Sequence, residues 1–357
     1  MDTVVGAVVE IACDESGFSG TNLLDPASPV ITHASVDLRV GEAVELVTTL
    51  RSGFRFSPHE FKSGQFLRNP AEGEALDWFL AALRSRAHVL LVDKEYFLIT
   101  RIVDLLLSEP SYAAGTRLTQ EQRPAALTLY RARHLAGCDW RVFLAAFVEL
   151  VRIKRRSRPD PLALERFFQA RDALLQDRLG ARAEDVIAGL SRTRVQAVLT
   201  RLLADDPSIP PPLEPMLPAL AETVLFWSGD DRRQVLVTHD EQSALTAGRL
   251  SRLQRILADG VGSSPPAGAD ETGSAPAGIS PLAGLLMADS RDDPRVQVAD
   301  LLAGVARRLP EVVDDGRLQP FLSPTSLCDP QPRRTTDHTA ATSPRTYPNA
   351  GTATPSG

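Results

Sequence analysis

The sequence has few cysteines and no long apolar run, and each shortage excludes a class of protein. Only three of the 357 residues are cysteine, and Cys13, Cys138 and Cys328 are far apart, which argues against a disulfide framework and fits a reducing cytoplasm. No CxxC pair or Cys/His cluster occurs, so a structural zinc site is not expected. No uninterrupted apolar run approaches about 18 residues, which excludes a transmembrane helix. We therefore expect a cytoplasmic protein that does not act at a membrane.

Motifs for several common functions are also missing. There is no GxxxxGK[ST] loop, no GxGxxG after a strand and no GxSxG elbow, so ATP-binding, NAD-binding and serine-hydrolase functions have no support. The net charge of -6 argues against a uniformly basic nucleic-acid binder, although not against a local basic surface. Residues 141–201 carry 13 basic and seven acidic side chains, including the run RIKRRSR at 152–158. This region fits a nucleic-acid clamp, or equally a helix C-terminus that attracts cations.

Hydrophobic periodicity divides the chain into two kinds of region. Residues 1–110 and 231–310 alternate strand-like apolar runs with amphipathic helices, which is typical of an α/β fold with helices on the faces of a sheet. Between them, residues 111–230 hold helical patterns almost alone and form an all-α insertion. Residues 259–281 are rich in Gly, Ser, Pro and Ala, which predicts a flexible loop, and the Thr/Pro/Ser-rich stretch 325–357 predicts a disordered tail.

The expected elements follow from the same patterns. In the α/β core we predict strands at 4–13, 29–38, 88–92, 234–238 and 282–288, an extended segment at 58–67, and helices at 41–51, 72–86, 96–107, 241–257 and 294–309. In the insertion we predict helices at 119–136, 139–154, 160–178, 182–204 and 214–226.

Aspartates recur at the ends of the predicted strands. Asp14, Asp93, Asp240 and Asp289 each follow a strand, and Asp300 lies on the last predicted helix. The functional sites of α/β sheets gather where strand ends meet, and clustered carboxylates repel one another unless a cation lies among them. Carboxylate oxygens favour Mg²⁺ or Mn²⁺, and two such ions can activate water and stabilise the leaving oxygen in phosphodiester cleavage. Alternatively, each aspartate is a turn former or a helix N-cap.

Asp300 is the least conventional of these residues. It lies within VQVADLLAGV, where Ala299, Ala303 and Gly304 allow the helix to approach a sheet closely. An aspartate at or near a face meant for burial is costly unless it is paired or bound to a metal. The alternative is a partly exposed Asp300 with Arg307 as its partner.

Five short motifs carry a resemblance to a known family. CDESG at 13–17, HEFK at 59–62, VDK at 92–94, VTHD at 237–240 and DSRDDPRVQVADLLAG at 289–304 resemble the motif series of the family called domain of unknown function 3800. That family is placed in the ribonuclease H-like superfamily, and the resemblance covers the two core regions but not the helical insertion or the tail. It implies a ribonuclease H-like mixed sheet with an acidic site for a divalent metal.

Carried over residue by residue, the resemblance implies a set of four metal ligands. They are Asp14 on the first strand, Glu60 on an extended segment, Asp240 at the end of the penultimate strand and Asp300 on the last helix. Asp289 is the alternative to Asp300 as the fourth ligand. For Glu15 the alternative is that it only faces solvent.

Lysine is scarce in this chain, and its positions support the same motifs. Of the 39 basic residues only Lys62, Lys94 and Lys154 are lysine, and the first two match lysine positions of the family. Each would contact a phosphate or balance the carboxylates, or would be a solvated surface lysine. His239, beside Asp240, would assist proton transfer or pack at a strand end.

The sequence thus leads to two functional hypotheses. The first is a metal-dependent nuclease or phosphodiesterase that acts on DNA or RNA with Mg²⁺ or Mn²⁺. The second is a non-catalytic ribonuclease H-like module that binds nucleic acid or a protein partner through the helical insertion.

Overall fold

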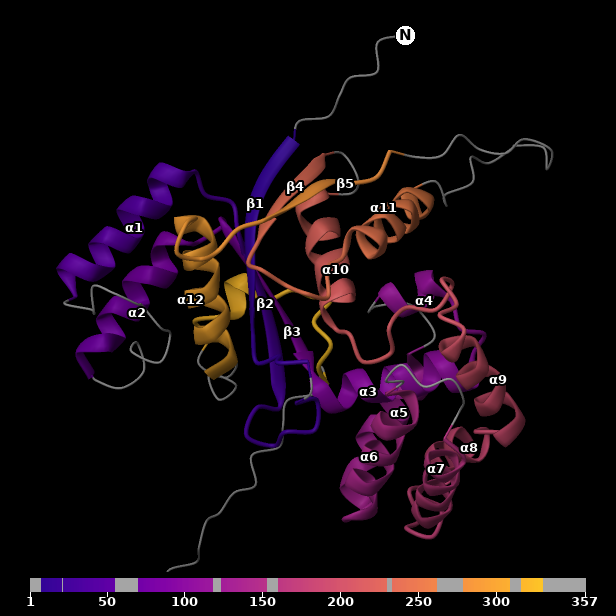
Figure 1. Cartoon of the computed structure of the whole chain (residues 1–357). Coiled ribbons are helices and arrows are strands. Elements are labelled where there is room, and N and C mark those ends of the chain that lie inside the picture. Colours follow the sequence, from indigo (N-terminus) through magenta and orange to yellow (C-terminus); the bar gives the residue numbers. More distant parts are fainter. Residues whose placement is uncertain are drawn as a thin grey trace, which may run out of the picture.

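A mixed five-stranded sheet forms the centre of the molecule (Figure 1). The structure is a computed structural model that describes residues 8–20, 22–54, 70–117, 123–152, 160–229, 233–261, 279–308 and 316–329. The strands are β1 (Val8–Ser16), β2 (Val30–Val36), β3 (Ala87–Asp93), β4 (Gln234–His239) and β5 (Leu282–Met287), in the order β3-β2-β1-β4-β5. β1 and β2 are antiparallel, as are β2 and β3, whereas β1, β4 and β5 are parallel. This order and these directions confirm the predicted α/β fold and resemble the ribonuclease H-like topology.

Helices cover both faces of the sheet. On one face lie α1 (Val40–Gly53), α2 (Pro70–Ala82) and α12 (Pro294–Arg308), which share an apolar core with Ala12 of β1 and with Ala34 and Val36 of β2. α10 (Met216–Ser228) packs against β2, β3 and β4 on the other face, with α11 (Ala247–Val261) beside it. α10 was expected within the insertion, but its packing places it with the sheet.

The last helix, α12, runs alongside β1 in the same direction. Arg295 at its start pairs with Glu10 at 3.6 Å, and Arg307 near its end donates to the Ser16 hydroxyl at 2.9 Å. Leu301 and Leu302 are fully buried, and burial stabilises side chains of this type by about 1.5–3 kcal/mol each. The apolar side of α12 and these two polar contacts set its register against the first strand.

The helical middle region lies beside one end of the sheet (Figure 1) and shares a continuous apolar core with the α10 face of the sheet. Its members are α3 (Lys94–Ile102) with a π-helical turn (Val103–Leu107), α4 (Tyr112–Thr116), α5 (Pro124–Ala132), α6 (Asp139–Val151), α7 (Pro161–Leu174), α8 (Ala181–Ala188) and α9 (Arg192–Leu203). The single helix expected at 182–204 is two helices, because Ser191 caps a new start by accepting from Arg194 N. The helix expected from 241 begins at Ala247, after a turn.

The segment 316–329 lies against the outer edge of β3. Leu322 and Leu327 make bridges with Val89 and Val92, and the amide of Leu327 donates to the Leu91 carbonyl at 2.8 Å. Residues 325–329, which were expected in a disordered tail, are therefore paired with the sheet, and Leu327 is buried. Residues 330–357 lie outside the described residues, as do 55–69 with the expected extended segment and 262–278 of the expected loop.

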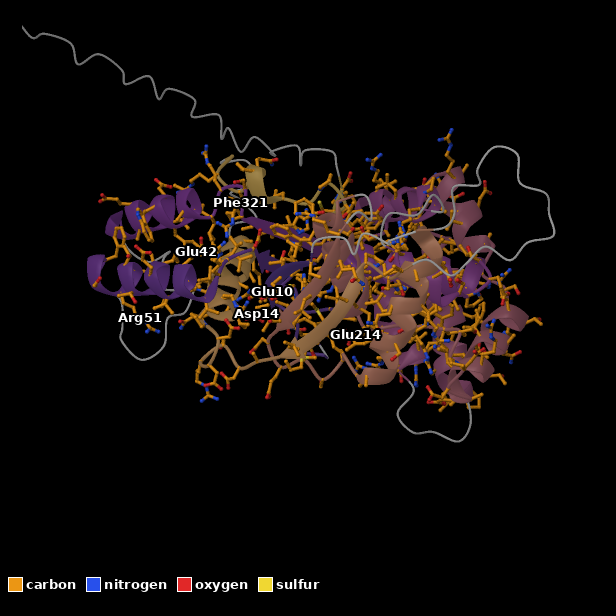
Figure 2. The ribbon with its side chains drawn as sticks, turned by 90° about the horizontal axis from the view of Figure 1, so that it is seen from above. Glu10, Asp14, Glu42, Arg51, Glu214 and Phe321 are labelled. Atoms are coloured by element: carbon orange, nitrogen blue, oxygen red, sulfur yellow. The ribbon has the colours of Figure 1, made fainter. Side chains whose placement is uncertain are left out.

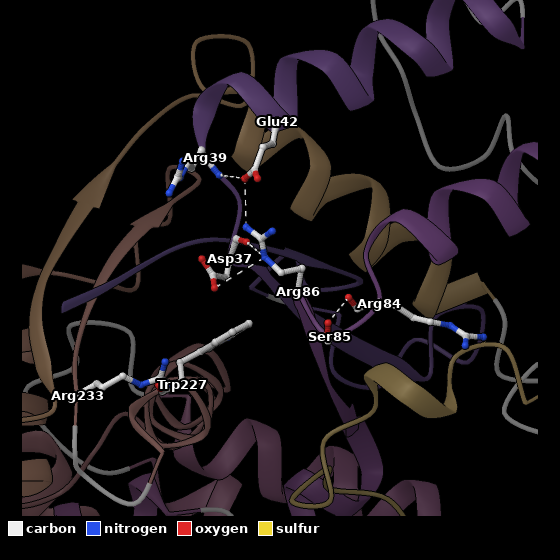
Figure 3. Close-up of polar contacts among 8 residues, drawn as sticks. All are labelled: Asp37, Arg39, Glu42, Arg84, Ser85, Arg86, Trp227 and Arg233. Carbon is white, nitrogen blue, oxygen red and sulfur yellow. Dashed lines mark hydrogen bonds and ion pairs between the residues drawn. The ribbon is translucent and has the colours of Figure 1, made fainter. Parts of the chain in front are cut away.

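A network of charged groups holds together the end of the sheet remote from the carboxyl end of β1 (Figure 3). Arg86 Nε donates to the Asp37 carbonyl at 2.7 Å, and Arg86 Nη2 donates to Glu42 Oε2 at 3.1 Å. The same Glu42 carboxylate accepts from the Arg39 amide at 2.7 Å, which completes the N-terminal cap of α1. These groups are partly exposed.

None of the described helices is both long enough and apolar enough to cross a bilayer.

Candidate functional site

Asp14 lies on the central strand and is almost completely buried, with 5% of its surface exposed. β1 was expected to end before Asp14, but it continues to Ser16, so the carboxyl group points out of a pleat rather than from a turn. Because side chains alternate along a strand, Asp14 shares the α12 face with Ala12, whereas Cys13 faces α10. The Glu15 amide donates to Asp14 Oδ1 at 2.7 Å and fixes the carboxyl group.

Three acidic side chains act electrostatically on Asp14: the adjacent Glu15, and Asp300 and Asp240 from remote parts of the chain. Burial, followed by the negative charges of Glu15, Asp300 and Asp240 in that order, raises the pKa of Asp14 to about 9. Its hydrogen bond from the Glu15 amide opposes this rise. We call Asp14, Glu15, Asp240 and Asp300 the acidic cluster. Asp14 is thus coupled electrostatically to a residue at the end of the fourth strand and to one on the last helix.

Asp240 is held at the carboxyl end of β4 by its neighbours. Its amide donates to the Cys13 carbonyl at 3.2 Å, which continues the pairing of β4 with β1. Its Oδ1 accepts from the Ser290 amide at 3.2 Å, in the turn after β5. The carboxylate is therefore anchored between two neighbouring strand ends, where it influences both Asp14 and Glu15.

Glu15 belongs to the cluster, although the expectation left it facing solvent. The pleat turns it toward the α10 side, where Gln242 Nε2 donates to its Oε1, while its Oε2 is buried without a hydrogen bond from the described residues. Burial and the charge of Asp240 raise the pKa of Glu15 to about 7, against the effect of the Gln242 hydrogen bond. Glu214 adds a smaller repulsion. Figure 2 shows Glu214 on one side of the sheet and α1, with Glu42 and Arg51, on the other, with Asp14 between them.

Two other strand-end aspartates have local roles. Asp289, the competing ligand, faces Arg291, whose hydrogen bonds lower the pKa of Asp289 to about 2. Asp93 caps α3 by accepting from the Tyr96 amide at 2.9 Å and also accepts from the Tyr130 hydroxyl at 2.6 Å. Both match the turn-former and N-cap alternatives rather than a metal site.

Lys94 is buried, but it faces a loop and not the acidic cluster. Its Nζ donates to the Asn22 carbonyl at 3.1 Å and to the Ser28 hydroxyl at 3.4 Å. Burial lowers the pKa of Lys94 to about 8, and the charged groups that act on it are Asp25 and Arg307. The bonds to Asn22 and Ser28 give it a structural role at the same end of the sheet. Glu60 and Lys62 lie outside the described residues.

The donor set suits a hard divalent cation by its chemistry. It consists of carboxylate oxygens, and one of them, Glu15 Oε2, has no hydrogen bond within the described residues. Burial and the neighbouring negative charges disfavour the ionised form of Asp14. A divalent cation would relieve that penalty. In the described part of the chain, however, no three His, Cys, Asp or Glu side chains are arranged closely enough to hold an ion. Binding would therefore require a rearrangement of side chains.

Comparisons with family models, with curated proteins and with solved structures find no match to this chain. The family resemblance accordingly depends on the quoted motifs and on the strand order of the sheet.

Proposed function

We propose that the protein is a cytoplasmic, divalent-metal-dependent phosphodiesterase that acts on nucleic acid, with a ribonuclease H-like core related to the domain of unknown function 3800 family. The observation that carries the proposal is the electrostatic coupling of Asp14 to Asp240 and Asp300. These residues lie on β1, at the end of β4 and on α12. Three separate elements therefore deliver acidic side chains to one end of a sheet of the expected topology.

Each residue of the cluster has a defined part in this proposal. Asp14, Asp240 and Asp300 would hold Mg²⁺ or Mn²⁺, with Glu60 as the fourth ligand that the resemblance implies. The cation would supply the positive charge that activates water and stabilises the leaving oxygen of a phosphodiester. Glu15, which is partly buried, would hold or accept a proton near that centre, because burial and the charge of Asp240 raise its pKa to about 7.

The cationic side chains at this end of the sheet would determine where a phosphate approaches. Arg307 lies on α12 with its Nε on the Ser16 hydroxyl, and Lys94 is its charged neighbour. We assign Lys62, by resemblance, to the balance of phosphate charge. Lys94, the other lysine that the resemblance implies, instead holds the loop of Asn22 and Ser28 in place.

The test is hydrolysis of a panel of DNA and RNA substrates in Mg²⁺ or Mn²⁺. Asp14→Asn and Asp300→Asn keep the size of the side chain and remove its charge, and each should lower cleavage by at least about 100-fold. Glu42→Gln, a carboxylate-to-amide change at the other end of the sheet, is the matched control and should cut like the parent. Unchanged cleavage by both cluster variants would refute the assignment.

The second candidate is a non-catalytic module that binds nucleic acid or a protein partner through its helical region. It is favoured by the lack of a ready three-ligand arrangement among the described side chains. Against it, several arginines of the helical region already pair with carboxylates, such as Arg166 with Glu149 and Arg192 with Glu165. Calorimetry with Mn²⁺ separates the two, because the catalytic candidate must take up the ion.

A further inference from the structure

A line of buried polar groups connects α10 to the acidic cluster. Thr223 Oγ1 on α10 lies 2.9 Å from His33 Nδ1 on β2. His33 Nε2 lies 3.1 Å from His239 Nε2 on β4, and His239 Nδ1 lies 2.9 Å from the Asp240 carbonyl oxygen. Thr223, His33 and His239 are fully buried, so water does not compete for these bonds.

The final acceptor determines the direction of every bond in this line. A carbonyl oxygen can only accept, so His239 Nδ1 must carry a hydrogen and donate to Asp240. Both rings are completely buried, where an imidazolium is costly, so each ring is neutral and carries one hydrogen. His239 Nε2 is therefore an acceptor and His33 Nε2 its donor. His33 Nδ1 must then accept, and the Thr223 hydroxyl donates.

We propose that this directed chain of hydrogen bonds orients the main chain at Asp240, with Thr223 and His33 as positioning residues for the candidate site. The mechanical link is short. The carbonyl held by His239 belongs to the same residue whose carboxyl group accepts from the Ser290 amide and acts on Asp14 and Glu15. As a device for that site, the proposal rests on the proposed function.

His88 provides a contrast within the same layer. It is also buried and packed against α10, with its ring stacked on Phe226 at a centroid distance of 3.8 Å. Neither of its ring nitrogens has a hydrogen-bond partner among the described residues, and burial lowers the pKa of His88 to about 3. Burial alone therefore does not force a histidine of this layer to form hydrogen bonds. The hydrogen bonds of His33 and His239 are thus not a general consequence of burial.

The first test reads the tautomers directly. Long-range ¹H–¹⁵N spectra of the full chain labelled at histidine should show His239 protonated at Nδ1 only and His33 protonated at Nε2 only, with assignments from His33→Gln and His239→Gln. A protonated Nε2 on His239, or an imidazolium at either position at pH 7, would overturn the proposal. This reading does not depend on metal binding or on any activity.

The second test asks whether the chain acts on Asp240. Thr223→Val removes the first donor and keeps the shape of the side chain, so it should shift the Asp240 amide resonance and weaken Mn²⁺ binding by about tenfold, as loss of an outer-shell partner does. Thr223→Ser keeps the hydroxyl and should restore both values. Thr100→Val is the matched control, because its buried hydroxyl bonds within its own helix, to the Phe97 carbonyl.

The outcomes separate the two proposals. If Thr223→Val leaves the Asp240 resonance unchanged, or if Thr100→Val moves it equally, the positioning role is refuted. If the parent chain binds no Mn²⁺, the proposed function fails, and the tautomers and the Asp240 resonance alone then decide whether the chain of bonds orients this residue.

Discussion

Two clusters of charged side chains lie inside the protein, one at the end of the sheet and one among the helices. In the acidic cluster, every charged group that acts on Asp14 is itself acidic. In the second, which we call the arginine cluster (Arg101, Asp104 and Arg123), one carboxylate lies 4.0 Å from Arg101 Nη1 and 3.6 Å from Arg123 Nη2.

The difference lies in where the counter-charge is found. The arginine cluster contains its own, so the folded chain holds it without a ligand, at a cost that appears as a pKa of about 10 for Arg101. The acidic cluster gathers like charges, and burial together with their repulsion favours the protonated forms of Asp14 and Glu15. A buried carboxylate on which only like charges act, as on Asp14, is the better candidate for a ligand site.

The largest effect should come from breaking the arginine cluster. Asp104→Ala leaves two buried guanidinium groups without their carboxylate and should lower the free energy of unfolding by about 3–5 kcal/mol, measured by urea denaturation. Arg101→Met should cost less, about 1–2 kcal/mol, because Asp104 keeps Arg123 as its partner. Equal losses for the two variants would show that the carboxylate is not what balances this cluster.

In the acidic cluster, removal of a carboxylate should raise the free energy of unfolding instead of lowering it. The pKa of Asp14 is raised from 3.8 to about 9 on folding, so the stability that its protonated form gives is present below about pH 4 and is lost as the pH rises toward 9. In metal-free buffer, Asp14→Asn should therefore exceed the parent in stability by about 1–2 kcal/mol at pH 8.

The same comparison at acid pH provides the control. Near pH 4 the parent and Asp14→Asn should unfold at almost the same denaturant concentration, because the aspartate is then protonated in the folded state. A parent that is more stable than the variant at pH 8 without metal would contradict the repulsion described for this cluster.

Adding a cation should reverse the order of these two proteins. At hundredfold excess over its dissociation constant, Mn²⁺ should raise the stability of the parent by about 2.7 kcal/mol, seen as a higher Tm. Asp14→Asn and Asp300→Asn should show little of this increase. Asp104→Asn, in the arginine cluster, should keep all of it if the two clusters are independent.

The smallest effect is expected at the partly exposed network around Arg86. Glu42→Gln removes a charge that Arg86 shares with solvent, and it lies away from both clusters. Its Tm should be within error of the parent, with and without Mn²⁺. A large shift in Tm would show that burial is not what distinguishes the two clusters from this partly exposed network.

Much of the sheet could be predicted because its strands are short apolar runs. The runs VITHASV and HVLLV are buried on both faces, so their composition alone marks them as interior strands. Asp14, Asp240 and Asp300 were proposed together because two of them follow predicted strands, one lies within an apolar helix, and all three fall in motifs that carry the family resemblance. The mixed sheet was expected from that resemblance, but the order of its strands was not predicted, because apolar runs carry no information on their neighbours.

Features that depend on tertiary contacts were harder to predict. β1 continues through three polar residues because β2 pairs with it as far as Ser16, whereas a composition rule stops at Asp14. Alternation from Ile11 would have placed Glu15 on the α10 face, and this was the available signal for its burial. Nothing local marks Leu327 as a partner of β3, because its neighbours are turn-forming residues.

The surroundings of Asp14 also constrain the order in which the chain folds during synthesis. The first strand reaches its final surroundings only after α12 has docked along it, since Arg295 and Arg307 contact Glu10 and Ser16. A nascent chain that has emerged only as far as β5 therefore exposes the apolar α12 face of the sheet and lacks one carboxylate of the cluster. Competence to hold an ion would then appear only after α12 has been synthesised.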